Sequence, residues 1–197
     1  MCLLFETIRM EPDGTIPLLP WHQARMDRAR MDLFGRADTL SLSGILLFPD
    51  SLQGKVIRCR VNYDRELVGV QYEEYIPRII RSLSLVKAND LSYAHKFADR
   101  HRLDELRRTV GTDEVIMVRN GFVTDASTAN LVFSRGSDLL TPLTPMLYGT
   151  RRQSLLDAGY IREEEIRAHD LDDFTEVFLI NALRKLESPL PLHAIIH

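Results

Sequence analysis

The stretch DEVIMVRNGFVTDASTANLVF (Asp113–Phe133) carries the clearest structural signal in this chain of 197 residues. Two apolar runs flank the dipeptide Asn120-Gly121, which favours the tight turn of a two-residue β-hairpin because both residues tolerate a positive φ. We therefore expect strands over Glu114–Arg119 and Phe122–Thr124, and Asn130–Ser134 continues the same sheet.

The residues that follow this hairpin predict more strands and one helix. Leu139–Thr141, Ile161–His169 and Glu176–Ile180 have the apolar and β-branched character of strands. Gly149–Ala158 has a helical pattern, and the glycine at position 159 predicts its end. The C-terminal part of the chain is therefore expected to be a sheet with one short helix.

The residues that precede the hairpin predict a second group of elements. Pro20 favours the start of a helix, and Gly35 favours its end. Further helices are predicted over Ala37–Phe48 and Phe97–Val110. Four strands are also expected, over Cys2–Arg9, Lys55–Tyr63, Leu67–Tyr75 and Ile79–Val86.

Taken in order, these elements predict an α+β fold made of mostly antiparallel strands with a few helices. The polar stretch Lys87–Ser92 resembles a linker between two lobes. We therefore place an N-terminal lobe at residues 1–87 and a C-terminal lobe at residues 88–197.

Composition excludes several classes of function. The net charge is −3, and the 25 basic residues are balanced by 28 acidic ones, so no stripe for nucleic acid is present. No apolar run approaches the roughly 18 residues that span a bilayer, so no membrane partner is expected. The six histidines lack the spacing of metal ligands, and Cys2 and Cys59 alone cannot form a zinc site. Because the chain has only two cysteines, a reducing, cytoplasmic location is favoured.

Six short segments occur in an order that is specific when they are taken together. They are LFETIR (Leu4–Arg9), WHQARM (Trp21–Met26), HKFADR (His95–Arg100), the stretch quoted first, TPLTPMLYGTRRQSLL (Thr141–Leu156) and EVFLINALR (Glu176–Arg184). This series resembles the class IV aminotransferase-like enzymes of fold type IV, which use pyridoxal 5′-phosphate (PLP). That family includes aminodeoxychorismate lyase, the branched-chain aminotransferases and the D-amino-acid aminotransferases.

The resemblance implies that Lys96 is the lysine that binds the cofactor. PLP is an aldehyde, so it needs an amine to hold it and later to move protons. The chain has four lysines, and Lys96 is the one that falls in the matching segment. An apolar or cationic surrounding lowers the pKa of a lysine amine, and His95, Phe97 and Arg100 are its expected neighbours.

The resemblance also implies a carboxylate beside the pyridine nitrogen of PLP, which keeps that nitrogen protonated. The family uses a glutamate in V-T-E, whereas this chain has Asp125 after Val123 and Thr124. The charge is the same, but the side chain is one methylene shorter. A turn-capping aspartate after the hairpin is the alternative interpretation.

The cofactor phosphate is a dianion, and the resemblance implies several groups that bind it. Arg25 matches the family's arginine and can bind in bidentate fashion. The helix start at Gly149, Thr150 and Arg151 offers backbone N–H groups and a favourable dipole. The turn at Asn181 and Ala182 is implied as another phosphate or carboxylate contact. A solvated arginine and an ordinary N-cap glycine are the alternatives for the first two.

The reaction itself is open between three interpretations. The opening and the ending of the chain are more similar to aminodeoxychorismate lyase, which releases pyruvate from 4-amino-4-deoxychorismate and gives 4-aminobenzoate. A branched-chain or D-amino-acid aminotransferase is the first alternative. A non-catalytic PLP-fold binding protein is the second, because the chain resembles a family member shortened at its N-terminal edge.

The resemblance further implies a small amine or amino-acid-like substrate and a homodimer whose cofactor lies between the two lobes. Four arginines are candidates for reading a substrate carboxylate, namely Arg9, Arg58, Arg60 and Arg100. The sequence does not distinguish among these four.

Overall fold

A computed structural model describes residues 2–192 and 195–196. The chain divides into two compact units, and each is built from two stretches of sequence. The first unit contains residues 1–77 and 95–99, and the second contains residues 78–94 and 100–197. The boundary predicted from the sequence lies between residues 87 and 88.

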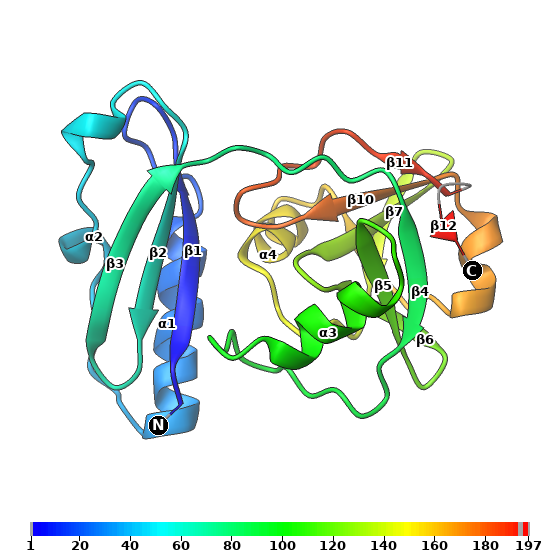
Figure 1. Cartoon of the computed structure of the whole chain (residues 1–197), viewed down its shortest axis with the longest axis horizontal. Helices are drawn as coiled ribbons and strands as arrows, with labels where there is room; N and C mark the ends of the chain where they lie inside the picture. The colour runs from blue at the N-terminus through cyan, green and yellow to red at the C-terminus, as the bar shows by residue number, and fades with distance from the viewer. Residues whose placement is uncertain (1, 193–194, 197) are drawn as a thin grey trace. The chain divides into compact units, whose positions relative to one another are not determined.

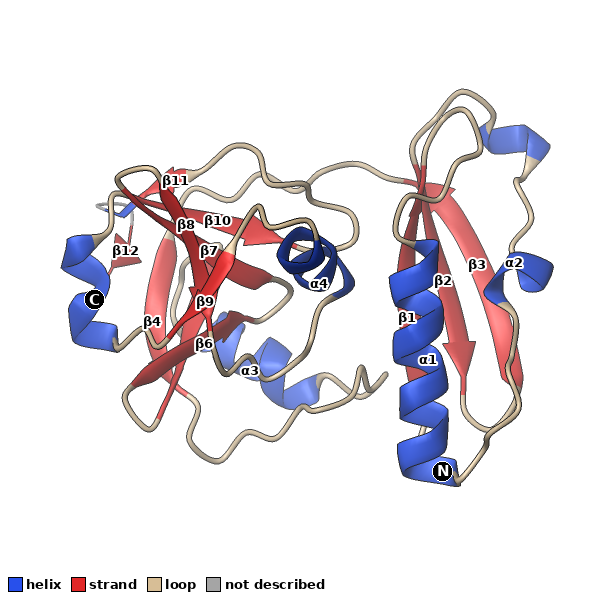
Figure 2. Ribbon diagram, turned by 180° about the vertical axis from the view of Figure 1, so that it is seen from behind, coloured by secondary structure: helices blue, strands red, loops and turns tan. Residues whose placement is uncertain are grey.

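The first unit is a three-stranded antiparallel sheet with a long helix packed on one face (Figure 1). Its strands occur in the order β1-β2-β3, with consecutive strands paired. The helix α1 lies along one face of this sheet when it is seen from behind (Figure 2). The elements are β1 (Leu4–Met10), α1 (Leu19–Phe34), α2 (Leu42–Ile45), the 3-10 helix η1 (Asp50–Leu52), β2 (Ile57–Tyr63) and β3 (Leu67–Glu74).

Alternation along the strands decides which face of this sheet is buried. Leu4, Ile8 and Met10 pack in one cluster with Met26 and Ala29 of α1. Because side chains alternate across a strand, the odd-numbered positions of β1 point to the opposite face. The sequence therefore separates an apolar face under α1 from a polar face on the other side.

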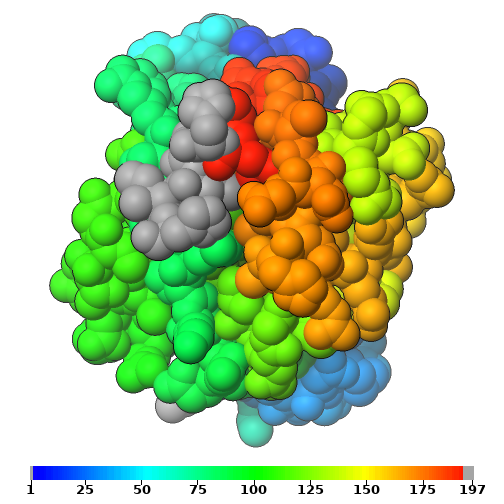
Figure 3. Space-filling model, turned by 90° about the vertical axis from the view of Figure 1, so that its right-hand side faces the viewer, coloured from blue at the N-terminus to red at the C-terminus, as the bar shows by residue number. Residues whose placement is uncertain are grey.

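The second unit is a larger sheet of nine strands. Its main path runs β11-β10-β7-β6-β5-β4-β12, and β8 and β9 extend from β7. The helical segment η2 lies on the surface of this unit (Figure 3). The elements are β4 (Leu83–Lys87), α3 (His101–Thr109), β5 (Glu114–Arg119), β6 (Phe122–Ala126), β7 (Asn130–Arg135), β8 (Asp138–Pro142), α4 (Thr150–Asp157), β9 (Arg162–Glu164), η2 (Ala168–Asp173), β10 (Glu176–Ile180), β11 (Leu190–Pro191) and β12 (Ile195–Ile196).

Local signals predicted the hairpin and the first helix correctly. Asn120 has φ 52° and Gly121 has φ 85°, as the turn between β5 and β6 requires. The helix α1 has a proline in its first turn and ends at Gly35, whose φ of 63° is left-handed. The amide of Gly35 donates to the carbonyl of Met31 at 2.9 Å, which closes the last turn.

Two of the predicted helices are wrong in extent. Over residues 37–48 the structure has only the single turn Leu42–Ile45, because Ser and Gly in this segment are weak helix formers. The helix predicted from Phe97 begins at His101 instead. The amide of Ala98 donates to the carbonyl of Leu3 at 2.8 Å, so the residues before the helix join β1 as an extended segment.

The polar stretch read as a linker is part of the second unit. Ala88 is fully buried and Leu91 is nearly so, and the amide of Ala88 donates to the carbonyl of Val118 at 2.9 Å. The strand before it is also shorter than predicted and covers Leu83–Lys87. Likewise, the strand predicted over 161–169 reduces to Arg162–Glu164 followed by η2.

Among the described residues, no helix combines the length and the apolar character needed to cross a membrane.

Candidate active site

The predicted site residues fall into two groups, one in each unit. Lys96 and Arg25 belong to the first unit. The second unit holds the remaining predicted residues, which are Asp125, Gly149, Thr150, Arg151, Asn181 and Ala182. Each group is described with its own unit below.

Lys96 lies in the short extended segment that pairs with β1. The amide of Phe5 donates to the carbonyl of Lys96 at 3.0 Å, and Phe97 forms an antiparallel bridge with Leu4. The segment is therefore fixed by backbone hydrogen bonds on both sides of Lys96. A lysine held in this way presents its amine from a rigid element, as a covalent attachment point requires.

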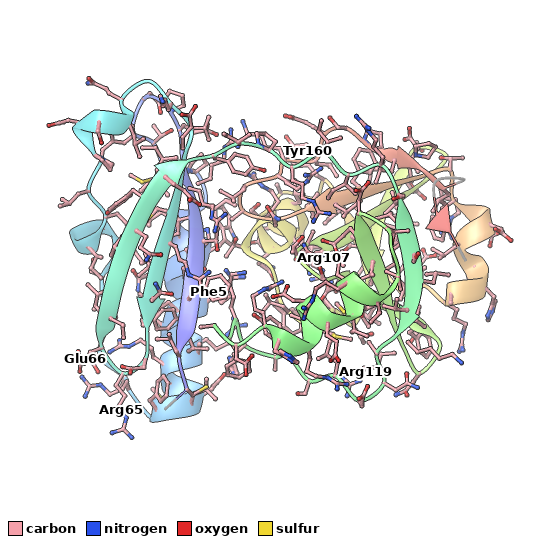
Figure 4. All side chains as sticks on the ribbon, viewed as in Figure 1. Phe5, Arg65, Glu66, Arg107, Arg119 and Tyr160 are labelled. Carbon is pink, nitrogen blue, oxygen red and sulfur yellow. The ribbon has the colours of Figure 1, made fainter. Side chains whose placement is uncertain are left out.

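The amine of Lys96 lies over an aromatic ring that is shared with an arginine. Phe5 projects from β1 (Figure 4), and the Nζ atom of Lys96 is 4.5 Å from its ring centroid. The guanidinium carbon of Arg60 is 3.9 Å from the same centroid. The neighbours predicted from the sequence are His95, Phe97 and Arg100. Phe5 and Arg60 were missed because they are far from it in the chain.

Arg25 lies on α1 and binds a buried carboxylate. Its Nε atom donates to Oε1 of Glu6 at 2.9 Å, and its Nη2 atom contacts the other oxygen. His22, one turn earlier on the same helix, places Nδ1 2.6 Å from Oε2 of Glu6. Glu6 and His22 are fully buried, so Arg25 belongs to a buried polar cluster of three side chains.

The pKa values in this cluster follow from its charges. Burial alone would raise the pKa of Glu6, but Arg25 and His22 outweigh it and lower that pKa to about 2. Burial lowers the pKa of His22, against the opposing effect of Glu6, and the charge of Lys96 lowers it further. The imidazole is therefore neutral at pH 7 and donates Nδ1–H to the ionised Glu6. Its Nε2 atom is buried and has no hydrogen-bond partner in the described part of the chain.

Glu6 could have been found from the sequence. Glu6 lies between Leu4 and Ile8 on the same apolar face of its strand, where an ionised side chain needs a partner. His22 and Arg25 are three residues apart, so they lie on one face of a helix. An isolated acid on an apolar face, followed by such a basic pair, is a sequence signal for a buried ion cluster.

In the second unit, Asp125 is buried at the end of β6 and accepts three hydrogen bonds. Its Oδ1 atom accepts from Nδ2 of Asn130 at 2.6 Å. Its Oδ2 atom accepts from the backbone amides of Met146 at 2.7 Å and Leu147 at 3.0 Å. The Asn130 amide also donates to the Leu147 carbonyl at 2.9 Å.

Burial raises the pKa of Asp125 to about 6, although the amides of Leu147 and Met146 and the side chains of Asn130 and Arg152 oppose it. The carboxylate is therefore ionised at neutral pH and becomes protonated at mildly acidic pH. The donors to Asp125 are neutral and Arg152 acts through its charge alone, so together they offset the burial of Asp125 less fully than Arg25 offsets the burial of Glu6.

Gly149 is the N-cap of α4 and lies against the side chain of Asn130. A Cβ atom at position 149 would be 1.9 Å from Oδ1 of Asn130, so any other residue would displace the asparagine side chain. The same asparagine contacts Asp125. The helix start and the buried carboxylate are therefore coupled through one side chain.

The start of α4 has the character of an anion site. Thr150 is buried and Arg151 is half-buried at its first two positions. The first amides of a helix have no carbonyl one turn earlier to bind, and the helix dipole favours a negative charge there. The Nη2 atom of the buried Arg152 donates to the carbonyl of Pro142 at 2.8 Å and to Glu163 at 2.6 Å, so Arg152 anchors the helix.

The turn at Asn181 and Ala182 is built by the asparagine side chain. Its Oδ1 atom accepts from the amides of Leu183 and Arg184, each at 2.9 Å. Its Nδ2 atom donates to the carbonyl of Thr128 at 3.0 Å. The side chain therefore fixes the turn and ties it to the loop between β6 and β7.

These residues fit a phosphorylated aldehyde cofactor. The first unit offers an amine fixed over Phe5, and the second offers a buried carboxylate and a helix start whose glycine lies against Asn130. Within the first unit, an amine matches an aldehyde and a guanidinium matches a phosphate. Within the second unit, backbone amides match a phosphate and a carboxylate matches a protonated ring nitrogen.

The order of the elements and the geometry of both units define a fold-type IV protein. The PLP-bound structure of a hypothetical aminotransferase from Mycobacterium tuberculosis has the same fold, with a TM-score of 0.75 at 20% identity, over 98% of this chain and 81% of that one. The model of the family "Amino-transferase class IV" matches residues 59–187. The chain belongs to the class IV aminotransferase family, whose members are PLP-dependent lyases and aminotransferases.

Two Haemophilus proteins are similar over nearly their whole length. A protein of uncharacterized function from Haemophilus influenzae is 37% identical over 186 residues, which cover 93% of this chain and 98% of that protein. The crystal structure of a provisionally assigned 4-amino-4-deoxychorismate lyase from Haemophilus somnus has a TM-score of 0.85 at 30% identity. That similarity covers 94% of this chain and 98% of the other.

Proposed function

We propose that this protein is a PLP-dependent lyase that converts 4-amino-4-deoxychorismate into 4-aminobenzoate and pyruvate. The observation that carries the proposal is the similarity to the Haemophilus somnus protein, which spans almost all of both chains. The side chains described above supply the groups that this chemistry needs. The folate pathway, the homodimer and the cytoplasmic location implied by the resemblance stay predictions.

When bound, PLP supplies an aldehyde that takes up an amine and a ring that withdraws electrons from the reacting carbon. The amine of Lys96 would hold the cofactor and, as a free amine, would take the proton from the substrate carbon. Phe5 and the backbone bond to Lys96 orient that amine. Loss of that proton and cleavage of the ring's C–O bond would release the enol form of pyruvate, which takes up a proton and becomes pyruvate, and would leave the aromatic ring of 4-aminobenzoate.

In this proposal, Asp125 is the carboxylate that lies beside the ring nitrogen of PLP. Three donors already fix the carboxylate, and carboxylate oxygens have further lone pairs for an N–H donor. With a pKa of about 6, it is ionised at neutral pH and can keep the ring nitrogen protonated. The shorter side chain therefore has the right charge at the working pH.

The phosphate is assigned to Arg25, to the start of α4 and to the 181–182 turn. A guanidinium carries five N–H donors, so its pairing with Glu6 is compatible with a second anion. The amides of Gly149, Thr150 and Arg151 and the backbone at Ala182 supply neutral donors. In this proposal Asn181 shapes its turn, and the backbone makes the phosphate contact.

A class IV aminotransferase is the second candidate, because the family whose model matches is that of the class IV aminotransferases. The two reactions share the proton removal at Lys96 and differ in where the proton and electrons go next. Release of pyruvate without added keto acid supports the lyase. Amine transfer to a keto acid without pyruvate release from the ring supports the aminotransferase.

The test starts with the purified protein loaded with PLP. We expect a visible absorption band from lysine-bound cofactor and release of pyruvate from 4-amino-4-deoxychorismate. Lys96→Ala should abolish both, whereas Lys55→Ala, which alters an exposed lysine paired with Glu74, should retain both. A protein that takes up no PLP, or a Lys96→Ala variant that keeps full turnover, would contradict the proposal.

A further inference from the structure

Glu114 is a buried side chain of the second unit that the proposed function does not use. It is the first residue of β5 and is fully buried. Its Oε1 atom accepts hydrogen bonds from the amide of Val115 at 3.0 Å, from the amide of Ser127 at 3.3 Å and also from the hydroxyl of Ser127. Its Oε2 atom accepts from the hydroxyl of Thr128 at 2.8 Å. Because a buried carboxyl group needs such donors in place of water, the positions of Glu114 and of residues 127–128 are coupled.

The loop of residues 126–129 joins β6 to β7 and contains the more distant partners of Glu114. The amide of its first residue donates to the carbonyl of its last residue at 2.8 Å, which closes the loop. The residues on either side of it, Asp125 and Asn130, are partners in the register of the two strands and share a side-chain hydrogen bond. The 126–129 loop therefore adjoins the carboxylate that is assigned to the ring nitrogen.

The carbonyls of the same loop accept hydrogen bonds from two other parts of the unit. The Nη2 atom of Arg100 donates to the carbonyl of Ser127 at 2.7 Å. The Nδ2 atom of Asn181 donates to the carbonyl of Thr128 at 3.0 Å, which ties the loop to the 181–182 turn. One short loop therefore connects a group proposed for the ring nitrogen with a group proposed for the phosphate.

A ligand with a ring nitrogen at one end and a phosphate at the other needs its two binding groups at a fixed separation. Glu114 binds two successive residues of the 126–129 loop, which fixes the orientation of the loop as well as its position. A shift of the loop would change the separation of the two binding groups without removing either group. Binding groups that are held in place before the ligand arrives give a higher affinity than mobile ones.

We propose that Glu114 is a positioning residue for cofactor binding, which holds the 126–129 loop so that Asp125 and the 181–182 turn bind the two ends of one ligand together. The ligand class is a pyridine that carries a phosphate, as opposed to molecules that carry only one of these groups. This inference rests on the proposed function for what the two groups bind. It adds a buried acid that acts through its neighbours.

The test uses three probes that form no imine with Lys96. Pyridoxine 5′-phosphate, an alcohol analogue of PLP, has both ends of the ligand, whereas pyridoxine has only the ring and inorganic phosphate has only the other end. Each is titrated by calorimetry into the whole chain freed of PLP. The wild type should bind pyridoxine 5′-phosphate about 100-fold more tightly than either single-ended probe, because the second contact becomes intramolecular.

Two substitutions break the contact between Glu114 and the loop. Thr128→Val keeps the size of the side chain but removes the hydroxyl that donates to Glu114. It should weaken binding of pyridoxine 5′-phosphate by about 10-fold and leave the binding of each single-ended probe within about twofold. Glu114→Gln should give the same pattern, because it replaces one acceptor with a donor. Since both changes act on one contact, the double variant should lose little more than the larger single loss.

Two further variants serve as controls. Thr128→Ser retains the hydroxyl and should bind pyridoxine 5′-phosphate like the wild type. Glu176 is also the first residue of a strand in this unit and accepts from the hydroxyl of Ser134 at 3.4 Å, so Glu176→Gln should leave all three affinities unchanged. Thr128 is exposed, so its variants decide the question even if Glu114→Gln does not fold.

Three results would overturn the inference. Equal losses for all three probes would mean that Glu114 acts through the stability of the fold alone. A loss shared by pyridoxine 5′-phosphate and inorganic phosphate in Thr128→Val would mean that Thr128 binds the phosphate itself. Unchanged binding in both variants, or a wild type that binds pyridoxine 5′-phosphate no more tightly than the single-ended probes, would leave the loop without the proposed role.

The pyruvate assay distinguishes failure of this inference from failure of the proposed function. If the probes behave as expected but the PLP-loaded protein releases no pyruvate, the lyase reaction is wrong while the role of Glu114 stands. If pyruvate is released but Thr128→Val and Glu114→Gln bind pyridoxine 5′-phosphate like the wild type, the role of Glu114 is wrong while the lyase proposal stands.

Discussion

The two units each bury one carboxylate, and the pKa values of the two groups move in opposite directions. Glu6 in the first unit is fully buried, and its pKa falls to about 2. Asp125 in the second unit is only 4% exposed, and its pKa rises to about 6. Burial raises the pKa in both cases, so the difference lies in the partners.

The partner of Glu6 carries a full positive charge, whereas the three donors to Asp125 are neutral. Arg25 contacts both oxygens of Glu6, while two backbone amides and an asparagine bind Asp125. Hydrogen bonds from neutral groups replace water without supplying charge. A carboxylate held in this second way remains ready to accept another cationic donor, which suits a site for a protonated ring nitrogen.

The largest expected effect comes from removing the charge of Glu6. Glu6→Gln keeps the shape but leaves the guanidinium of Arg25 without its counter-charge, and breaking a buried ion pair costs about 3–5 kcal/mol. Trp21 is the chain's one tryptophan and lies on α1, so its fluorescence during denaturant unfolding reports on the first unit. A loss below about 1 kcal/mol would show that the cluster contributes little to stability.

The opposite pKa shifts predict opposite pH dependences of stability. The pKa of Glu6 is below its ordinary value of 4.5, so its contribution is complete above pH 4.5 and is lost as the pH falls towards 2. The pKa of Asp125 is above its ordinary value of 3.8. The folded state therefore holds the proton more tightly, and stability decreases as the pH rises from about 3.8 through 6.

Unfolding free energies across this pH range, measured for the wild type and for single variants, check these signs. The difference between wild type and Glu6→Gln should grow in favour of the wild type from pH 2 to pH 4.5. The difference between wild type and Asp125→Asn should shift against the wild type from pH 4 to pH 6 and then level off. Two curves with the same slope would contradict the role assigned to Arg25.

A smaller effect is expected from filling the contact between Gly149 and Asn130. In Gly149→Ala the new Cβ would be 1.9 Å from Oδ1 of Asn130, and overpacking of this kind costs about 1–3 kcal/mol. The displaced asparagine would also lose its bond to Asp125, so the pKa of Asp125 should rise further. Affinity for PLP, measured by titration of the visible band, should fall.

Gly69→Ala is the matched control for this substitution. No atom lies within 4 Å of the Cβ that would be added there, and its φ is not positive. Stability and PLP affinity should therefore stay close to those of the wild type. Equal losses in both variants would mean that the loss in Gly149→Ala does not come from Asn130.

The comparison also shows what sequence can and cannot predict. The turn at Asn120 and the end of α1 at Gly35 depend on the φ angles of single residues, so they were predicted correctly. The start of α3 depends instead on the pairing of residues 95–99 with β1. That pairing joins segments far apart in the chain, and helical periodicity alone extended the helix over them.

The same limit applies to the candidate site. The spacing of motifs selected Lys96 and Arg25, because a family resemblance is itself a pattern along the chain. The neighbours of Lys96 are Phe5 and Arg60, which only the sheet register and the extended segment bring near it. Local sequence could nominate the candidate lysine and arginine but not the groups that surround the lysine.

The smallest expected effect tests whether burial makes the ion pair of Glu6 important. Lys55 and Glu74 form a pair at 2.6 Å on the same unit, but both side chains are nearly half-exposed. Because water and salt screen such a pair, Glu74→Gln should cost about 0–1 kcal/mol, and the cost should shrink further in concentrated salt. Denaturant unfolding followed by Trp21 fluorescence, at low and high salt, measures it on the same scale as Glu6→Gln. If the exposed pair cost as much as the buried one, charge pairing alone would explain the importance of the Glu6 pair, and its removal from water would not be the reason.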